Sequence, residues 1–445
     1  MTTVELHAKR RQRLAKAMGP HSAAIVVAAP ALIRNRDTEH VYRQDSDFAY
    51  LTGFPEPEAV AVILRDASVK PVTILFCRDR NPEREIWDGK REGQDGARKN
   101  FGIDDAFSIS QIDELLPRLL ENRRAVYWDF GKLKEWDDKL GVWCNTVKQK
   151  SRAGVRAPEQ FFSLDAIVHE MRLRKDAHEV AIMRRAARIS AQAHRRAMQQ
   201  CHVGLHEYEI EAELLHEFTR FGSRAPAYPS IVAGGANACV LHYRDNNAML
   251  NNGDLLLIDA GCEIDNYASD ITRTFPVNGT FTPAQRAVYE LVLKAQHAAI
   301  AKVRPGKRWN EPHDTAVQVL TTGMVKLGLL KGRVSKLIKD GAYRRFYMHR
   351  TGHWLGMDVH DVGEYRVDNK WRKLEPGMVL TVEPGMYIAP RSKGVAKEWW
   401  GIGVRIEDDV LVTRTGHDVL TAFAPKTVND IEALMAHGAR QRAGR

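Results

Sequence analysis

The first third of the chain alternates short apolar runs with amphipathic segments. Three runs of strand length, at residues 23–29, 59–64 and 72–77, consist almost entirely of apolar residues. Such runs predict strands that are buried on both faces. Residues 112–122 have the spacing of an amphipathic helix. Because buried strands here alternate with helical segments, we expect an α/β layer.

A long helix is expected to follow this layer. Asp176 and Glu179 have the spacing of a capping box, and an apolar stripe through Ile182, Ala186 and Ile189 follows them. Because the pattern changes at this helix, we place a domain boundary near residue 173. This predicts an N-terminal α/β domain at 1–172 and a second domain at 173–445.

The second domain groups its elements rather than alternating them, which favours an α+β fold with antiparallel sheet. Helices are expected at about 206–222, 283–303 and 312–328. Strands are expected at 254–260, 267–277, 378–388 and 402–413.

Composition narrows the class of protein. The 445 residues suggest about two or three domains. The five cysteines are odd in number and have no CxxC spacing, which argues against a disulfide framework or a thiolate metal site. No run of 18 apolar residues occurs, and residues 1–18 lack the apolar core of a signal peptide. We therefore expect reduced thiols, a cytoplasmic location and no membrane partner.

The Lys and Arg excess, 66 against 56 acidic residues, gives a formal charge of +10. A nucleic-acid-binding protein is one explanation, and a solvated basic surface is the other. The basic residues are spread widely, and one of the denser groups, residues 171–175, is not interleaved with aromatic residues. We therefore favour the solvated surface and expect no nucleic-acid partner.

Two aspartates flank a predicted hairpin. Asp259 ends the apolar run 255–258, and Asp270 lies on the returning arm. If Ile264 and Asp265 form a two-residue turn, Asp259 and Asp270 face each other directly. Like charges that face each other across a hairpin are destabilising, and a bound cation would reverse that effect.

Two further apolar strands end in carboxylates, at Glu383 and Glu407. Alternation along the strand places Arg405 and Glu407 on one face. Charges at the ends of buried strands are unfavourable unless they are paired or bind a metal. A single such carboxylate is more often structural, so the combination of four carries the argument.

The histidine segment 349–361 contains His349 and His353 four residues apart. The zinc-binding helix with this spacing requires Glu after the first His, but Arg350 stands there, and Gly352 precedes His353. We therefore expect His353 in a loop. Four carboxylates with one histidine suit Mn²⁺, Mg²⁺ or Fe²⁺ better than a thiolate zinc site, and two divalent ions would balance four negative charges.

These segments closely resemble the bacterial Xaa-Pro aminopeptidase (aminopeptidase P) family of metallopeptidases. The resemblance rests on residues 258–279, 353–363, 374–388 and 401–413, together with 34–60 near the N-terminus. It implies a pita-bread catalytic domain at 173–445 and a smaller, creatinase-like α/β domain at 1–172.

The resemblance also implies a ligand set for two metal ions, most simply Mn²⁺. Asp259 would hold the first ion, and His353 and Glu383 would hold the second. Asp270 and Glu407 would bridge both.

Other residues take substrate roles by the same resemblance. His242 and His360 would steady the substrate carbonyl and the tetrahedral intermediate, with Glu383 as the proton shuttle. His349, Tyr387 and Arg405 would surround the proline ring and the downstream chain. A purely structural role remains open for His242.

Trp87 resembles a tryptophan that members of the family contribute to a neighbouring subunit, and an ordinary packed aromatic residue is the alternative. The family also implies a homo-oligomer, either a dimer or a tetramer.

The implied reaction releases the N-terminal residue from peptides with proline at the second position, through a hydroxide that bridges the two ions. A prolidase, which cleaves Xaa-Pro dipeptides, shares the metal ligands and stays open as an alternative. A non-catalytic nucleic-acid or protein-binding member of the fold is the alternative of another class, and the complete ligand set argues against it. The N-terminal domain argues against methionine aminopeptidase.

Overall fold

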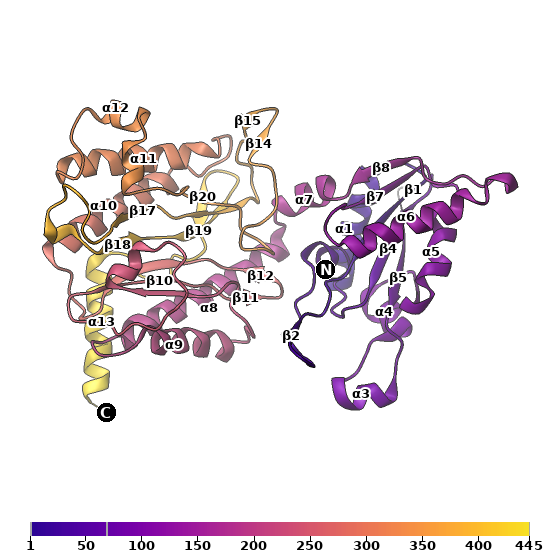
Figure 1. The fold of residues 1–445 in the computed structure, drawn as a ribbon, viewed down its shortest axis with the longest axis horizontal. Coiled ribbons are helices and arrows are strands. Elements are labelled where there is room, and N and C mark those ends of the chain that lie inside the picture. Colours follow the sequence, from indigo (N-terminus) through magenta and orange to yellow (C-terminus); the bar gives the residue numbers. More distant parts are fainter. Residues whose placement is uncertain (1, 68–69, 445) are drawn as a thin grey trace. The chain divides into compact units, whose positions relative to one another are not determined.

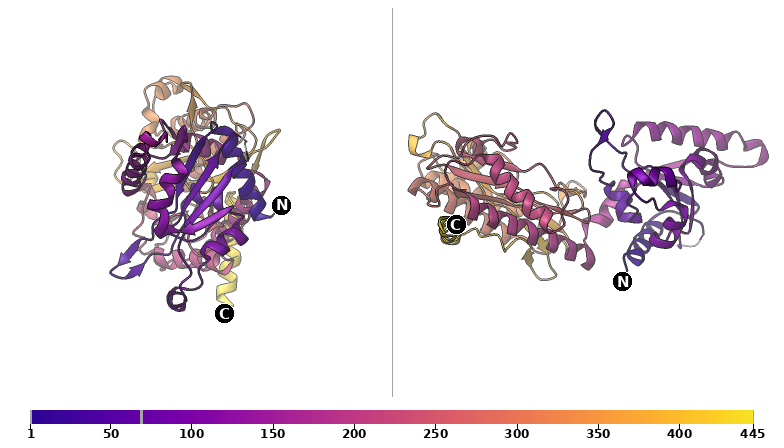
Figure 2. Two further views of the ribbon diagram at one scale, coloured as in Figure 1. Left: turned by 90° about the vertical axis from the view of Figure 1, so that its right-hand side faces the viewer. Right: turned by 90° about the horizontal axis from the view of Figure 1, so that it is seen from below.

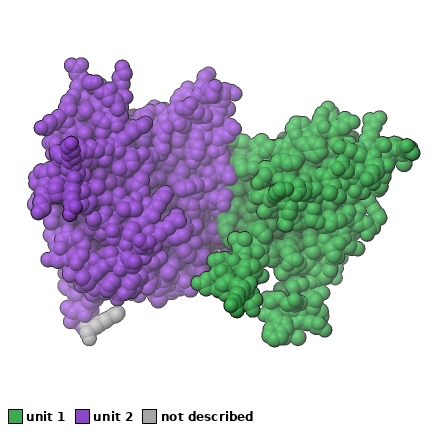
Figure 3. Space-filling model, in the orientation of Figure 1, with its two compact units in different colours: residues 1–172 green, residues 173–445 purple. Residues whose placement is uncertain are grey.

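The computed structural model describes residues 2–67 and 70–444, which divide into two compact units, 1–172 and 173–445. Figure 3 colours the two units separately. In the described part of the chain, no helix combines the length and the apolar character that a bilayer crossing requires.

The first unit is built on a six-stranded mixed sheet with the order β6-β5-β4-β1-β7-β8. Its strands lie side by side in the left panel of Figure 2. The strands are β1 (Ser22–Val27), β4 (Val60–Arg65), β5 (Val72–Cys77), β6 (Asp105–Ser108), β7 (Ala125–Trp128) and β8 (Gln160–Ser163). The three apolar runs of the sequence thus form the adjacent strands β1, β4 and β5. A small hairpin of β2 (Ile33–Asn35) and β3 (Thr38–Glu39) stands apart from this sheet.

Helices complete the first unit: α1 (Thr3–Ala17), α2 (Ser46–Thr52), α3 (Pro82–Asp88), α4 (Gly93–Phe101), α5 (Ile112–Leu120), α6 (Lys134–Lys148) and α7 (Asp165–Leu173). Residues of α5 and α6 form one apolar core with β1, β4, β5 and β7. Helix α3 differs from the others because none of its residues is buried, and Ile86 and Trp87 are 81% and 83% exposed. Trp87 is therefore not packed within its own unit.

The second unit arranges helices outside two groups of strands. The first group has the order β13-β10-β9, with β9 (Ile231–Gly234), β10 (Leu255–Asp259) and β13 (Thr272–Pro276). The second group contains β16 (Val379–Val382), β19 (Asp408–Val412) and β20 (His417–Val419), together with the pair β17 (Gly385–Ile388) and β18 (Ile402–Arg405). The pairings within both groups are antiparallel, as the sequence predicts.

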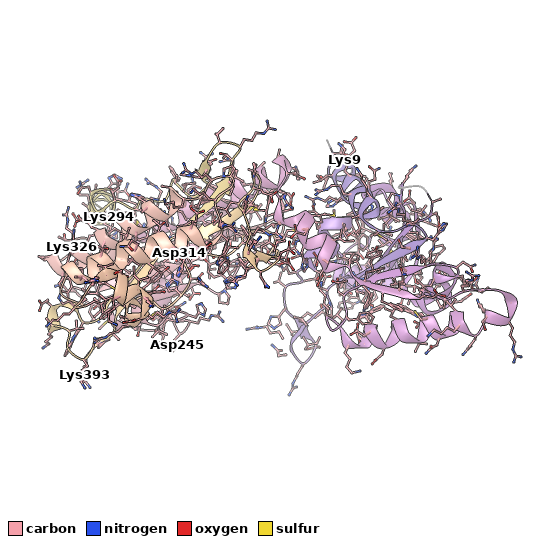
Figure 4. All side chains as sticks on the ribbon, turned by 90° about the horizontal axis from the view of Figure 1, so that it is seen from above. Lys9, Asp245, Lys294, Asp314, Lys326 and Lys393 are labelled. Atoms are coloured by element: carbon pink, nitrogen blue, oxygen red, sulfur yellow. The ribbon has the colours of Figure 1, made fainter. Side chains whose placement is uncertain are left out.

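The helices α8 (Ala177–Gln200) and α9 (Glu207–Arg220) lie beside the first group, and α10 (Pro283–Ile300) and α11 (Asn310–Lys326) lie beyond the second (Figure 1). The polar faces of α10 and α11 carry the exposed Lys294, Asp314 and Lys326, which are labelled in Figure 4. Smaller elements are α12 (Val334–Lys339), α13 (Val428–Ala443) and the hairpin of β14 (Arg366–Val367) and β15 (Lys370–Trp371). The predicted capping box forms, because the Asp176 side chain accepts from the N–H groups of His178 and Glu179.

The turn of the hairpin after β10 lies one residue later than the sequence analysis expects, so each residue pairs with a partner two positions further along. The tip strands β11 (Glu263–Ile264) and β12 (Tyr267–Ala268) enclose a turn of Asp265 and Asn266, whose φ angles are 50° and 64°. Turns with two positive φ angles match the twist of a hairpin and favour Asp and Asn. Asp259 consequently pairs with Thr272, and the expected direct pairing with Asp270 is wrong.

Candidate metal centre

Asp259 and Asp270 come together in the second unit despite the changed register. A shift of two residues keeps a side chain on the same face of the sheet. Tyr228 lies between the two carboxylates: its hydroxyl is 2.7 Å from Oδ1 of Asp259 and also contacts Oδ1 of Asp270. A phenol has one proton to donate, so it cannot satisfy both carboxylates at once.

Arg405, at the end of β18, connects several of the predicted residues. Its Nη2 donates to Oδ2 of Asp259 at 2.6 Å, and its Nη1 donates to the Tyr387 hydroxyl at 3.0 Å. The Tyr387 hydroxyl lies 2.9 Å from Nε2 of His349. In this structure Arg405 is therefore the ionic partner of a carboxylate and also a neighbour of the two residues predicted to bind substrate.

Glu407 is 2% exposed and lies directly before β19. Thr272, in β13, donates from Oγ1 to Oε2 of Glu407 at 2.6 Å and accepts from Nε of Arg405 at 3.1 Å. Asp409, two residues further on, accepts from the Asp270 N–H at 3.2 Å and from Ser269 Oγ at 2.9 Å. These bonds connect the start of β13 to the start of β19, where the carboxylate side chains lie.

His353 lies in a loop, as the flanking glycines predict. Its Nδ1–H donates to the Trp354 carbonyl at 2.9 Å, which leaves Nε2 facing the carboxylates. Nε2 is 3.4 Å from Oδ2 of Asp270 and 3.9 Å from Oε1 of Glu383. Ligating atoms of Asp270, His353 and Glu407 all lie within 4.8 Å of one another.

The remaining predicted residues lie at different distances from this group. The ring of His360 stacks edge-on against His353, with centroids 4.3 Å apart, and His349 Nδ1 is 3.6 Å from Oε2 of Glu383. His242 is exposed on its loop, and burial is the main reason that the pKa values of His349 and His360 are lowered. Trp87 belongs to the first unit and is not among these residues.

The electrostatics of the group are those of crowded, buried acids. Burial, and then repulsion from Asp270, Glu383 and Asp259, raises the pKa of Glu407 well above its ordinary value. Burial also raises the pKa of Glu383, to about 7. Burial lowers the pKa of His353, but its hydrogen bond to Asp270 and the charges of Asp270 and Glu383 together outweigh that effect and raise the pKa to about 9.

This donor set fits divalent cations. Four carboxylates share the ion pairs of Arg405 and His353, so their negative charge exceeds the positive charge beside them. Carboxylate oxygen with one imidazole nitrogen is a ligand set for Mn²⁺, Fe²⁺ or Zn²⁺. Bound cations would also remove the repulsion that raises the pKa of Glu407.

A second acidic group lies in the first unit, where α2, α7 and the end of β7 meet. We call it the α7 cluster, and it consists of Asp45, Asp47, Asp129, Lys132, Asp165, His169 and Arg172. Ligating atoms of Asp47, Asp165 and His169 lie within 4.8 Å of one another, but Arg172 Nη1 already donates to Oδ1 of Asp47 at 2.7 Å. Lys132 Nζ lies 2.8 Å from Oδ2 of Asp45. Protein cations therefore already pair with three of these four acids, and Asp129 is the exception, because burial and its contact with Asp165 raise its pKa to about 7.

Sequence reasoning missed Tyr228, Thr272 and Asp409. Tyr228 precedes a proline in an irregular segment and carries no periodic signal. Asp409 is the third acid of the run 407–409. The strand alternation that places Glu407 on the same face as Arg405 also places Asp409 there, so the sequence alone can identify Asp409 as a candidate.

Comparison with known proteins extends the assignment to the whole chain. Residues 181–414 match Metallopeptidase family M24, and residues 7–127 match the aminopeptidase P N-terminal domain. The Xaa-Pro aminopeptidase of Escherichia coli is 47% identical, over 97% of this chain and 98% of that protein. Human Xaa-Pro aminopeptidase 3 is 34% identical, over 94% of this chain and 81% of that protein.

Solved structures agree over both units. Aminopeptidase PepP of Pseudomonas aeruginosa superposes with a TM-score of 0.97 at 58% identity, covering 99% of each chain. Zinc-substituted E. coli aminopeptidase P in complex with product superposes with a TM-score of 0.96 at 46% identity, covering 98% of this chain and 99% of that one. The second unit thus has the pita-bread fold, and the chain belongs to metallopeptidase family M24, in the aminopeptidase P branch that carries the additional N-terminal domain.

Proposed function

We propose that this chain is a metal-dependent aminopeptidase that releases the N-terminal residue from peptides with proline at the second position. The observation that carries the proposal is the convergence of four buried carboxylates with His353 and Arg405. The near full-length similarity to proteins named Xaa-Pro aminopeptidase supports this substrate class.

The proposed ligands divide between two divalent ions. Asp259 would hold the first ion, His353 and Glu383 would hold the second, and Asp270 and Glu407 would serve both. When bound, two such ions make hydroxide available near neutral pH and polarise the substrate carbonyl. We propose Mn²⁺ as the native metal, and the zinc-substituted E. coli protein is a reason to test Zn²⁺ beside it.

The side chains around the metal ligands bind substrate and move protons. Glu383 carries a proton to the nitrogen of the departing proline. His360 and His242 donate hydrogen bonds to the carbonyl oxygen as its negative charge develops. An Xaa-Pro bond has no N–H of its own, so the site needs no acceptor for one.

His349, Tyr387 and Arg405 are the proposed surroundings of the proline ring and the downstream chain. They are linked to one another through the Tyr387 hydroxyl. This link fixes the position of the His349 imidazole relative to the carboxylates, because a hydrogen-bonded aromatic pair has few alternative rotamers.

We further propose a homo-oligomer, dimer or tetramer, in which the exposed Trp87 contacts a neighbouring subunit. A cytoplasmic location is the last part of the proposal. All five cysteines are free, which suits a reducing compartment.

The decisive assay compares a Xaa-Pro-Xaa tripeptide with the matching Xaa-Pro dipeptide. Protein stripped by a chelator is assayed alone and after addition of Mn²⁺ or Zn²⁺. We expect cleavage that depends on metal and favours the tripeptide. Cleavage confined to the dipeptide would make the protein a prolidase. Cleavage of neither peptide by folded, metal-loaded protein would exclude the proposal.

A further inference from the structure

Glu207, in the first turn of α9, is a fully buried acid at 0% exposure. No cation compensates it among the ion pairs of the described residues; its hydrogen-bond partners are all neutral. The N–H of Gly234 and Nδ2 of Asn237 donate to Oε1 at 2.7 and 3.0 Å. The Tyr243 hydroxyl and the N–H of Ala248 donate to Oε2, both at 2.8 Å.

This arrangement saturates the carboxylate. An ionised carboxylate has about four acceptor positions and no donor, and Glu207 meets four donors. A buried charge is strongly unfavourable unless such bonds compensate it. Loss of any of the four donors would therefore leave the buried carboxylate with an unpaired acceptor position.

Gly234 is the last residue of β9, and the other three donors lie near the start, in the middle and at the end of the 235–248 loop that follows it. This loop carries His242 and makes apolar contacts through Ala238, Leu241 and Tyr243. Val240 is 54% exposed, and Asp245 is exposed at the edge of the unit (Figure 4). Asn246 also holds the loop, through hydrogen bonds with Val232 and Ser230, and the Glu207 carboxylate is the point at which the start, middle and end of the loop converge.

The loop is also tied to the substrate side of the centre. Leu241 and Tyr243, on either side of His242, pack against a small apolar cluster that includes Leu257 and Tyr387. Burial, and then the hydrogen bond to Glu207, raises the pKa of Tyr243 to about 12, so its hydroxyl keeps the proton that it donates. Any shift of the Tyr243 ring would move the adjacent His242.

We infer that Glu207 is a positioning residue, whose buried carboxylate fixes the 235–248 loop and, through it, the His242 imidazole beside the substrate. The inference rests on the proposed function, in which His242 donates to the substrate carbonyl.

Glu207→Gln is the sharpest variant, because it preserves shape but turns two acceptor positions into two donors. The new amide then faces either the pair Gly234 and Asn237 or the pair Tyr243 and Ala248. Glu209→Gln is the matched control. This substitution removes the same charge from the same helix. The Glu209 side chain accepts from the His206 N–H and does not contact the loop.

The test is a double-mutant cycle in metal-loaded protein on the Xaa-Pro-Xaa tripeptide. We expect Glu207→Gln to lower kcat/KM by about 10- to 100-fold, the effect of misplacing a reacting group by about 1 Å. In a His242→Ala background the same change should lower it by less than about twofold, because the coupled group is already absent. Equal losses in both backgrounds would mean a merely structural role and would overturn the inference.

A second readout does not depend on activity. Amide hydrogen exchange of residues 234–248 should accelerate by about tenfold or more in Glu207→Gln and stay at the wild-type rate in Glu209→Gln. Unchanged exchange in Glu207→Gln would overturn the inference even if the enzyme is active. If wild type cleaves neither peptide, the proposed function fails, and accelerated exchange would still support the anchoring of the loop.

Tyr243→Phe covers the case in which Glu207→Gln does not fold. It removes one of the four donors and adds no mismatched group, so the loop should loosen less. We expect a loss of about fivefold in kcat/KM, corresponding to one hydrogen bond, again only when His242 is present. A loss of the same size in the His242→Ala background would contradict the proposed coupling.

Discussion

The two acidic groups of this protein use the same residue types and reach opposite electrostatic outcomes. In the α7 cluster, Arg172 pairs with Asp47 deep in the unit, with side chains 2% and 5% exposed. Lys132 and His169 pair with neighbouring acids. In the metal centre, Arg405 and His353 pair with Asp259, Asp270 and Glu383, and burial together with repulsion from these acids raises the pKa of Glu407. The spacing of ligating atoms alone would identify both groups as candidate metal sites. The number of acids that are paired with protein cations distinguishes them.

Substitution of a bridging ligand should show the largest difference between the two groups. Asp270→Ala removes a carboxylate on which both proposed ions depend. We expect hydrolysis of the tripeptide to fall by more than about 100-fold, since substitutions outside the ligand set already cost about 10- to 100-fold. Circular dichroism should show an intact fold. Retained metal-dependent turnover would contradict the bridging assignment.

The corresponding change in the α7 cluster should affect stability without affecting metal content. Asp47→Asn removes the carboxylate charge that faces Arg172 Nη1 at 2.7 Å, and breaking a buried ion pair in this way typically lowers the free energy of unfolding by about 3–5 kcal/mol. We expect a loss in this range by chemical denaturation of the first unit, with metal stoichiometry and tripeptide cleavage as in wild type. Loss of a bound metal from Asp47→Asn would show that the α7 cluster is a metal site after all.

Two histidines, His169 in the first unit and His194 in the second, should make the stability of their units depend on pH in opposite directions. We expect these effects to be smaller. Burial lowers the pKa of His169, but hydrogen bonds to Asp165 and Asp47 outweigh this and raise it to about 9. A raised histidine pKa stabilises the folded state fully below the unfolded value of about 6.5, and this stabilisation is lost as the pH rises to about 9. We expect a loss of up to about 3 kcal/mol in the first unit over that range, because one pKa unit corresponds to about 1.4 kcal/mol.

In the second unit the sign is reversed at His194. Complete burial lowers its pKa to about 4, so stability falls as the pH drops from about 6.5 towards 4. Hydrogen exchange resolved by residue can follow both units in one sample. His169→Gln should abolish the alkaline effect and leave the acid effect in place. An alkaline loss that persists in His169→Gln would assign it to another group.

The hairpin after β10 shows where sequence reasoning succeeds and where it stops. The run 255–258 identifies a buried strand that ends in a charge, and this part of the prediction is confirmed. The sequence predicts the turn one residue too early, at Ile264 and Asp265. The observed turn residues are Asp265 and Asn266, which tolerate positive φ. The pairing partner of Asp259 moves by two residues, from Asp270 to Thr272. Because residues two apart lie on the same face of a strand, the side chains of Asp259 and Asp270 still lie close together.

Tyr228 marks a different limit. Its position between Asp259 and Asp270 depends on a segment that reaches the site from outside the strands. Periodicity and strand ends hold no information about such a contact. The α7 cluster is equally invisible in the sequence, because it assembles residues that lie more than 100 positions apart. Resemblance to a family supplies the ligand set, but the structure is needed to show which acids are already neutralised.

The exposure of helix α3 has a consequence for the proteolysis of this protein. A short helix with no buried residue can unfold locally at little free-energy cost, and such segments are preferred sites of proteolytic nicking. Arg84 lies within it and Arg91 lies just after it, so trypsin should cleave here before it reaches either core. The rate of that first cut, measured against protein concentration, reports directly how often this helix is covered by another molecule.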